Sequence, residues 1–319
     1  MAPNAPSAGG GHSYHDADGN ATPHRASEPG SGPIVGIVGA GAVGTALGVA
    51  ISRAGWRVGA VASRDPGRRE RFVALVPGVR AFAEPAAILD EVELAILTVP
   101  DDAIPAVAGS MRLYSGQALI HTSGLLGREV LTAAMGAGCY IGAFHPLVSF
   151  TSDVERSVAG LRGATIALES DPQILGMLAD MAELIGGVPV RLPEGTKAAY
   201  HAAAVLASGG LVALLDAVVK LGAAAGMDEH GAVAVYGRLM EQTLANARAI
   251  GVDAALTGPV ARGDVGTLEA HIEALRLLAP GVVDLYAAAS LIETDIAVER
   301  GSLAPDAAER VRRALAKDV

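Results

Sequence analysis

The sequence has few of the residues on which secreted or nucleic-acid-binding proteins depend. Cys139 is the only cysteine in 319 residues, so no disulfide can form within the chain, which fits a reducing compartment. Lysine and arginine form no run longer than two residues and the formal net charge is -10, so we expect no nucleic-acid partner. Aromatic residues make up only 3% of the chain, and alanine, valine and leucine must therefore fill the core. We expect a cytoplasmic protein.

Long uninterrupted hydrophobic runs are also lacking. The mean hydropathy is positive, +0.38, but glycine, serine or a charge interrupts each apolar stretch before it reaches about 18 residues. Residues 202–219 come nearest and contain Asp216, so we expect a buried helix of a soluble domain and no membrane contact. Residues 1–32 lack the basic start and apolar run of a signal peptide, and their glycine, serine and proline content predicts a disordered tail.

From Pro33 onward, short β-rich segments alternate with alanine- and leucine-rich helical segments, which predicts a parallel sheet wound with crossover helices. The expected strands are Ile34–Val38, Arg57–Ala62, Val79–Phe82, Leu94–Val99, Ala118–His121, Tyr140–Phe144, Thr165–Leu168 and Val188–Arg191. Long helices are expected after them, at Glu194–Ala225, Asp228–Ile250, Gly266–Leu278 and Val283–Val298, with Pro193 at the start of the first. The predicted fold class is α/β: a Rossmann doubly wound parallel sheet over residues 33–192, followed by a mostly α-helical domain over residues 193–319.

A glycine-rich segment follows the first expected strand directly and opens the first expected helix. Its residues, Gly39, Ala40, Gly41, Ala42, Val43 and Gly44, form a G-x-G-x-x-G pattern. In this context the first glycine permits a tight turn, the second lets the backbone approach a pyrophosphate, and the third lets the helix pack on the strand. The segment predicts a dinucleotide site.

The end of the second strand suggests which dinucleotide binds. An NAD enzyme usually places a carboxylate there to hold the ribose 2′-hydroxyl, but this sequence has Ser63 followed by Arg64. A guanidinium pairs with a 2′-phosphate, which favours NADP. Asp65 is the alternative, because a shift of two residues would put a carboxylate at the site.

Four further segments, together with the glycine-rich segment, carry a resemblance to a known family. They are Thr98–Ile104, His121–Gly124, His145–Leu147, and Lys197–His201 with Thr257–Pro259 and Arg262–Asp264. With these segments the chain resembles an uncharacterised bacterial family of Rossmann-like NADP oxidoreductases, related to the 6-phosphogluconate and β-hydroxyacid dehydrogenases and to pyrroline-5-carboxylate reductases. The resemblance implies a 6-phosphogluconate dehydrogenase-like helical C-terminal domain. One position departs from it, because Ser208-Gly209 stands where Ser-Asn is expected.

Three residues are candidates for proton transfer. Lys197 and His201 are four residues apart on an expected helix and so lie on one side of it. By resemblance to β-hydroxyacid dehydrogenases, Lys197 is the general acid and His201 orients the substrate or shares the proton. His145, before Pro146, is a rival acid, because its placement is similar to the His-Pro segment of prephenate dehydrogenases. Each of the three could instead be a structural or solvated residue.

Other strand ends supply candidate binding residues. His121, Thr122 and Ser123 could hold a substrate carboxylate or the nicotinamide amide, or could merely shape their loop. Thr98, Val99, Pro100 and Asp101 are expected to border the nicotinamide ribose, although Asp101 and Asp102 could instead merely cap the next helix. Arg262 could clamp an anionic substrate, or Arg262 and Asp264 could pair with each other or with the other subunit. No cysteine or histidine cluster has zinc spacing, and we expect no metal.

These features predict an NADP-dependent oxidoreductase that transfers a hydride between NADPH and a small oxo or hydroxy acid or related carbonyl compound, with ketopantoate-type 2-oxo acids as one example. The alternatives are a prephenate-type dehydrogenase and a non-catalytic NADP-binding sensor. The first is weakened because this sequence does not have the continuation that such a dehydrogenase would show after His145-Pro146. We expect a homodimer, because several helices of the C-terminal half are apolar on more than one face.

Overall fold

The chain folds into two compact units, of which the first ends at Val205 and the second begins at Leu206. The structure is a computed structural model, and it describes residues 32–136 and 138–316. The disordered tail expected over residues 1–32 lies outside the described residues up to residue 31. Each unit is described by itself.

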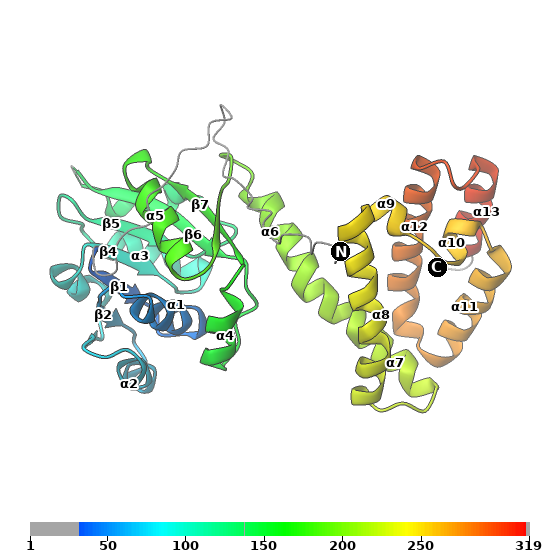
Figure 1. Cartoon of the computed structure of the whole chain (residues 1–319), viewed down its shortest axis with the longest axis horizontal. Helices are drawn as coiled ribbons and strands as arrows, with labels where there is room; N and C mark the ends of the chain where they lie inside the picture. The colour runs from blue at the N-terminus through cyan, green and yellow to red at the C-terminus, as the bar shows by residue number, and fades with distance from the viewer. Residues whose placement is uncertain (1–31, 137, 317–319) are drawn as a thin grey trace, which may run out of the picture. The chain divides into compact units, whose positions relative to one another are not determined.

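An eight-stranded sheet forms the centre of the first unit (Figure 1). Its strands are β1 (Val35–Val38), β2 (Val58–Ala62), β3 (Arg80–Phe82), β4 (Leu94–Leu97), β5 (Ala118–His121), β6 (Tyr140–Pro146), β7 (Thr165–Ser170) and β8 (Val188–Arg191). The order across the sheet is β3-β2-β1-β4-β5-β6-β7-β8. All eight strands lie within two residues of their expected bounds. Strands β1, β4 and β5 are buried throughout, as is typical of parallel strands covered on both faces.

The sheet is mostly parallel, as predicted, and departs from a parallel arrangement at one strand pair. Strand β7 runs antiparallel to β6, with Phe144 opposite Leu168, whereas β8 is again parallel to β7. The connection over residues 147–164 contains one short helix, α4 (Val154–Gly160), and begins and ends at the same edge of the sheet. Since the chain does not cross to the opposite edge there, the next strand must run in the opposite direction.

Helices cover both faces of the sheet, which makes the first unit doubly wound. One face carries α1 (Ala42–Arg53), α2 (Pro66–Leu75), α4 and α5 (Pro172–Leu184), and the other carries α3 (Ile104–Ser110) and the 3₁₀ segments η1 (Pro85–Glu91) and η3 (Arg128–Ala134). Leu47 and Phe72 belong to the core on the first face, and Ile104 and Leu131 belong to the core on the second. The Rossmann fold class is therefore confirmed.

The second unit is helical (yellow-green to red in Figure 1). It contains α7 (Leu211–Ala224), α8 (Glu229–Ile250), α9 (Val252–Ala255), α10 (Pro259–Arg262), α11 (Val265–Leu278), α12 (Val283–Glu299) and α13 (Pro305–Ala316). Asp228 and Asp264 are the N-caps of α8 and α11, where each carboxylate accepts a backbone N–H bond three residues on. The three long helices expected after residue 227 are present within one residue of their bounds.

The first long helix of the C-terminal half differs from its expected form in three ways. It begins at Lys197 and not near Pro193, and the π-helical segment Leu206–Gly210 separates α6 (Lys197–Val205) from α7. Residues 197–224 form the one helix among the described residues that is long and apolar enough to cross a membrane, with a mean hydropathy of 2.1. Only 6% of its most apolar window is buried, so the expectation of a buried helix is wrong for this chain alone.

The division between the units also differs from the expected domain boundary. We expected the helical domain to begin at residue 193, but α6 belongs to the first compact unit, which ends at Val205. The reason lies in the side chains of Lys197 and His201, which contact loops at the edge of the sheet. Helix α6 is therefore part of the same unit as the glycine-rich segment Gly39–Gly44.

Candidate active site

The glycine-rich loop between β1 and α1 has the geometry that its sequence predicts. Gly39 has φ +109°, a conformation that residues with side chains rarely adopt. A Cβ on Gly44 would lie 2.0 Å from the Gly39 carbonyl oxygen, so only glycine lets α1 pack this closely on the strand. The Thr98 hydroxyl, at the end of β4, lies 2.6 Å from the same oxygen. The loop is therefore fixed between the carboxyl ends of two neighbouring strands.

One side of this loop faces open space. A Cβ built on Gly41 would meet no atom within 4 Å, and no side chain caps α1, whose N-cap is Gly41. The first N–H groups of α1 are thus free to bind an anion, with the helix dipole favouring negative charge. Ala40 is buried, Val43 is half-buried and Ala42 is exposed. These residues fit the pyrophosphate of a nicotinamide dinucleotide, whose chemistry would be hydride transfer.

The segment after β2 places an arginine and an aspartate in different environments. Arg64 is exposed, and among the described residues its side chain has no hydrogen bond or ion pair. The Asp65 carboxylate instead caps α2, where it accepts the Arg68 backbone N–H (3.1 Å), and this bond lowers the pKa of Asp65. Arg69 donates to the carbonyl oxygens of Ser63 and Arg64 and so holds the turn. Asp65 is engaged in its own helix, whereas Arg64 is available.

Thr98, Val99 and Pro100, the residues expected to border a nicotinamide ribose, follow β4 directly. Strand β4 adjoins β1 on one side, while β2 adjoins β1 on the other, so the carboxyl ends of β1 and β4 form the switch point of the sheet. Thr98 and Val99 are half-buried and Pro100 is exposed. These residues lie where a ligand bound to the glycine-rich loop would extend along the sheet edge.

Ser123 connects the loop after β5 to its surroundings. Its N–H donates to His121 Nδ1 (3.1 Å), its hydroxyl donates to Asp101 (2.7 Å), and the same hydroxyl accepts the backbone N–H groups of Leu125 and Leu126. His121 is fully buried, and its Nε2 lies 3.1 Å from the Gly127 carbonyl oxygen. Both ring nitrogens of His121 are thus used within the loop. A direct contact between His121 and a substrate would require one of these bonds to break.

Thr122 is half-buried between these residues. Its backbone N–H donates to the Leu97 carbonyl oxygen (3.0 Å), and its hydroxyl lies 3.3 Å from the same oxygen. Thr122 therefore ties the loop to the end of β4.

Lys197, the first residue of α6, contacts the loop after β5. Its side chain is buried, with 5% of the residue exposed, and Nζ donates to the Ser123 carbonyl oxygen at 2.8 Å. Burial lowers the pKa of Lys197 to about 8, although the carboxylates of Glu169, Asp101 and Glu129 oppose the shift. An ammonium with this pKa exchanges a proton readily near neutral pH. The structure thus brings Lys197 next to the loop after β5.

His145 and His201 lie beside the same loop. Their ring centroids are 5.9 Å apart at an interplanar angle of 79°, and His145 Nδ1 lies 3.4 Å from the Tyr200 hydroxyl oxygen. Burial lowers the pKa of His145 to about 4, with Lys197 and His201 adding to the shift, so the His145 ring is neutral at neutral pH. His201 Nδ1 is buried and has no hydrogen-bond partner. All three proton-transfer candidates therefore occupy one edge of the first unit.

Some residues of this cluster carried no role in the sequence analysis. Tyr200 lies three residues after Lys197, and this helical spacing alone would have placed the two side chains on one side of the helix. Glu169 is the carboxylate with the largest opposing influence on Lys197, but its position depends on the antiparallel pairing of β7 with β6, which no local pattern signals.

Arg262, a candidate substrate residue, lies in the second unit. It is exposed at the end of α10, and the Asp264 carboxylate accepts from the Thr267 backbone N–H (3.2 Å) and hydroxyl (2.7 Å). These bonds lower the pKa of Asp264. The departure Ser208-Gly209 lies in the exposed π-helical segment at the start of the second unit.

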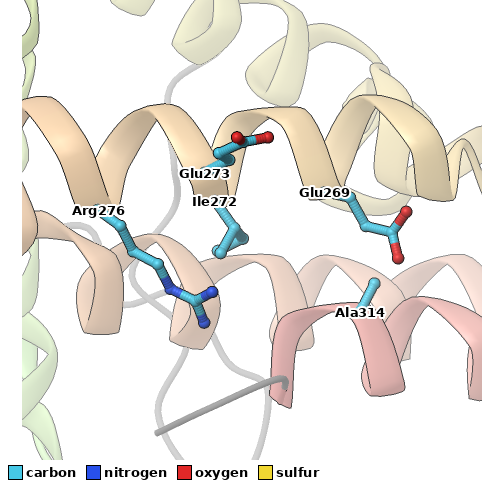
Figure 2. Close-up of a pocket in the computed structure, with 5 residues that line it drawn as sticks. All are labelled: Glu269, Ile272, Glu273, Arg276 and Ala314. Atoms are coloured by element: carbon cyan, nitrogen blue, oxygen red, sulfur yellow. The ribbon is translucent and has the colours of Figure 1, made fainter.

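The second unit has a shallow depression between α11 and α13. Figure 2 shows Ile272 and Arg276 of α11 projecting toward α13, where Ala314 lies, with Glu269 and Glu273 also lining the depression. Its lining mixes both signs of charge and contains no residue with a role in the site above. Within residues 32–136 and 138–316, no group of histidine, cysteine or acidic residues could hold a metal ion.

The fold and the glycine-rich loop define a dinucleotide-binding Rossmann protein. Comparison with known families agrees, because residues 24–146 match a Rossmann-like domain and residues 164–292 match a domain of unknown function, DUF2520. The chain therefore combines a Rossmann-like domain with a DUF2520 domain. This is the organisation that the resemblance implied.

Solved structures share this fold over most of the chain. A Bacteroides fragilis protein provisionally named an NADP oxidoreductase, BF3122, has a TM-score of 0.70 at 19% identity, covering 83% of this chain and 98% of its own. Protein TM1727 of Thermotoga maritima has a TM-score of 0.64 at 26% identity, covering 84% and 99%. An imine reductase from a Pseudomonas species has a TM-score of 0.63 at 18% identity, covering 85% and 99%.

A curated relative matches part of the chain. L-aspartate dehydrogenase 3 of Bordetella bronchiseptica is 28% identical over 45% of this chain and 60% of its own length. The chain thus spans about three fifths of that relative.

Proposed function

We propose that the protein is an NADP-dependent oxidoreductase that reduces a small carbonyl compound, with 2-oxo acids as the first class to test and imines as the second. One observation carries the proposal: the open glycine-rich loop and the cluster of Lys197, His145 and His201 belong to the same unit and lie at carboxyl ends of its strands. Ligands of doubly wound sheets bind at this edge. The names of the Bacteroides, Pseudomonas and Bordetella proteins support the same class.

The proposed cofactor residues are those whose positions are described above. They are Gly39, Ala40, Gly41, Ala42, Val43 and Gly44 for the pyrophosphate, Ser63 and Arg64 for the adenosine ribose, and Thr98, Val99 and Pro100 for the nicotinamide ribose. NADP is favoured over NAD because Arg64 is unpaired among the described residues and Asp65 is held in its helix cap. Bound NADPH would supply the hydride.

The chain's own residues would supply the proton and orient the substrate. As the hydride adds to the carbonyl carbon, the carbon–oxygen π electron pair moves to oxygen, and this oxygen must take a proton. Lys197 is the proposed donor, because its pKa of about 8 leaves it mainly protonated at neutral pH and close to the value that suits proton transfer. His145 and His201 are the proposed hydrogen-bonding partners of the same oxygen. Ser123 and Thr122 hold the loop, and Arg262 remains a candidate for an anionic substrate group.

Oxidation of NADPH, followed at 340 nm, tests this function. The purified protein is mixed with NADPH and a panel of 2-oxo acids including ketopantoate, aldehydes, and ketones mixed with amines that form imines. We expect turnover with at least one member and none without substrate. Tight NADPH binding with no oxidation across the panel would contradict the enzyme and favour a nucleotide-binding sensor.

We also propose that the protein is a cytoplasmic homodimer. Large apolar side chains of the π-helical segment, α7 and α8 are exposed, among them Leu206 (73%) and Leu239 (59%). A second copy carries the same surface and can cover it about a two-fold axis. A lipid bilayer suits this surface less well, because the exposed ion pair Asp216–Lys220 lies on α7.

A further inference from the structure

Gly124, in the loop after β5, lies next to the imidazole rings of His145 and His201. A Cβ built on Gly124 would lie 2.3 Å from His201 Nδ1 and 2.8 Å from His145 Nε2. Real Cβ atoms essentially never approach other atoms this closely, so any side chain at position 124 would force both rings to move. Gly124 is buried and does not have a positive φ, so contact and not backbone conformation requires glycine here.

The elements that carry the two rings are held in place by other contacts. His145 is on β6, whose backbone pairs with both β5 and β7, and its Nδ1 lies 3.4 Å from the Tyr200 hydroxyl. His201 is on α6, whose first residue, Lys197, is bonded to Ser123, the residue just before Gly124. The loop is fixed in turn by the Ser123–Asp101 bond and by His121. Strand β6, helix α6 and the loop itself are therefore each held by other contacts, so none of them can easily shift to make room for a methyl group at position 124.

We propose that Gly124 is a positioning residue: the absence of its side chain lets His145 and His201 converge on the loop that Lys197 holds, and so fixes the two rings for substrate. The description of these rings as substrate-binding rests on the proposed function. The placement of the rings by Gly124 does not, because it follows from contacts within the chain. The His201 Nδ1 fits this role, because it is buried close to Gly124 and has no hydrogen-bond partner within the described residues, whereas buried polar atoms in native proteins normally find one.

Histidine NMR on the protein without cofactor or substrate tests the placement. The Gly124→Ala variant is compared with wild type and with Gly109→Ala, a matched control in α3 where an added Cβ meets no atom within 4 Å. The resonances are assigned with His145→Asn and His201→Asn. In Gly124→Ala the pKa of His145 should rise from about 4 by about one unit or more toward 6.5, because displacement of the ring restores its contact with water. Gly109→Ala should match wild type.

Activity gives the second readout. In the substrate assay, Gly124→Ala should lower kcat/KM by about 10- to 100-fold, while the Kd for NADPH changes by less than about twofold, because misplaced groups lose catalysis without touching the cofactor loop. An unchanged His145 pKa in Gly124→Ala would overturn the proposal whatever the activity. A raised His145 pKa in a protein that turns over no substrate would support the placement and contradict the proposed function alone.

A double variant covers the case in which Gly124→Ala folds poorly. His201→Ala removes the ring that lies 2.3 Å from the added Cβ, so Gly124→Ala should lower Tm less in that background than in wild type. An equal loss of Tm in the two backgrounds would overturn the proposal.

Discussion

Lys197 combines two properties that rarely occur together, burial and an ammonium group. Its Nζ donates to a backbone carbonyl oxygen, while three carboxylates nearby favour the charged form. Burial nevertheless lowers the pKa of Lys197 to about 8. Lowered pKa values of this kind are common among catalytic acids and bases.

Replacement of Lys197 with methionine should separate catalysis from cofactor binding. If Lys197 donates the proton, Lys197→Met should lower kcat by about 10² to 10⁴, while the Kd for NADPH stays nearly the same because the cofactor loop is not altered. Steady-state kinetics and NADPH titration measure the two quantities. A raised KM with normal kcat would reassign Lys197 to substrate binding, and His145 or His201 would become the candidate acid.

The pH dependence of turnover should follow the same group. The protonated ammonium is the active form of a general acid, so kcat/KM should be constant only well below pH 8 and should fall as the pH rises through the Lys197 pKa of about 8, where half of the ammonium groups have lost their proton. His145 titrates near pH 4 and should not affect this limb. The measurement is kcat/KM, which reports the ionisations of the free enzyme, in overlapping buffers from pH 6 to pH 10. A rate that increases above pH 8 would mean that the neutral amine is the active form.

Arg64 should determine the choice between NADPH and NADH. Its guanidinium is exposed and, among the described residues, unpaired, so Arg64→Ala should weaken NADPH binding by about 10-fold or more through loss of a charge-assisted bond to the 2′-phosphate. NADH binding should be unaffected. Arg71→Ala, on the neighbouring α2 helix, is the control for general loss of positive charge. NADH binding at least as tight as that of NADPH to the wild-type protein would contradict the NADP preference.

At the scale of elements, the junction of β1 with α1 offers a comparison between two glycines of one loop. Gly44→Ala would press a methyl group against the Gly39 carbonyl oxygen, so it should lower the free energy of unfolding by about 1 to 3 kcal/mol. Gly41→Ala meets open space, so it should leave stability unchanged and weaken NADPH binding by projecting into the pyrophosphate position. Denaturant unfolding and NADPH titration test both. Equal stability of the two variants would contradict this packing.

The sequence predicts an element well when the element's own residues determine its structure. Each parallel strand is a short apolar segment, and the glycine-rich loop needs only β1 and α1, so both were predictable. The direction of β7 depends on which edge the 147–164 connection reaches, and the Ser123–Asp101 and Lys197–Ser123 bonds join residues 22 and 74 positions apart. Composition likewise could not show that the apolar helix 197–224 is exposed, because its burial depends on which other elements pack against it.

At the scale of the whole molecule, the second unit exposes more apolar surface than a lone chain is expected to leave in water. Exposed large hydrophobic residues occur along the π-helical segment, α7 and α8, and α8 has Ala232 as its one buried residue over 22 positions. Extended apolar surface of this kind usually marks an interface. A second copy of the chain is the partner we propose.

Sedimentation should therefore show a dimer at micromolar concentration. Leu239→Glu, in the middle of α8, places a charge in the proposed interface and should shift the protein toward monomer, because a buried unpaired carboxylate is costly. Leu277→Glu is the matched control: Leu277 is 81% exposed but lies on α11, outside the proposed surface, so this variant should remain dimeric. Flotation with phosphatidylcholine vesicles distinguishes the membrane alternative, which predicts association of the wild-type protein with lipid. A wild-type monomer that floats with vesicles would mean that the apolar surface binds a bilayer. A wild-type monomer that does not float would mean that a different protein covers this surface. Either result would refute the homodimer.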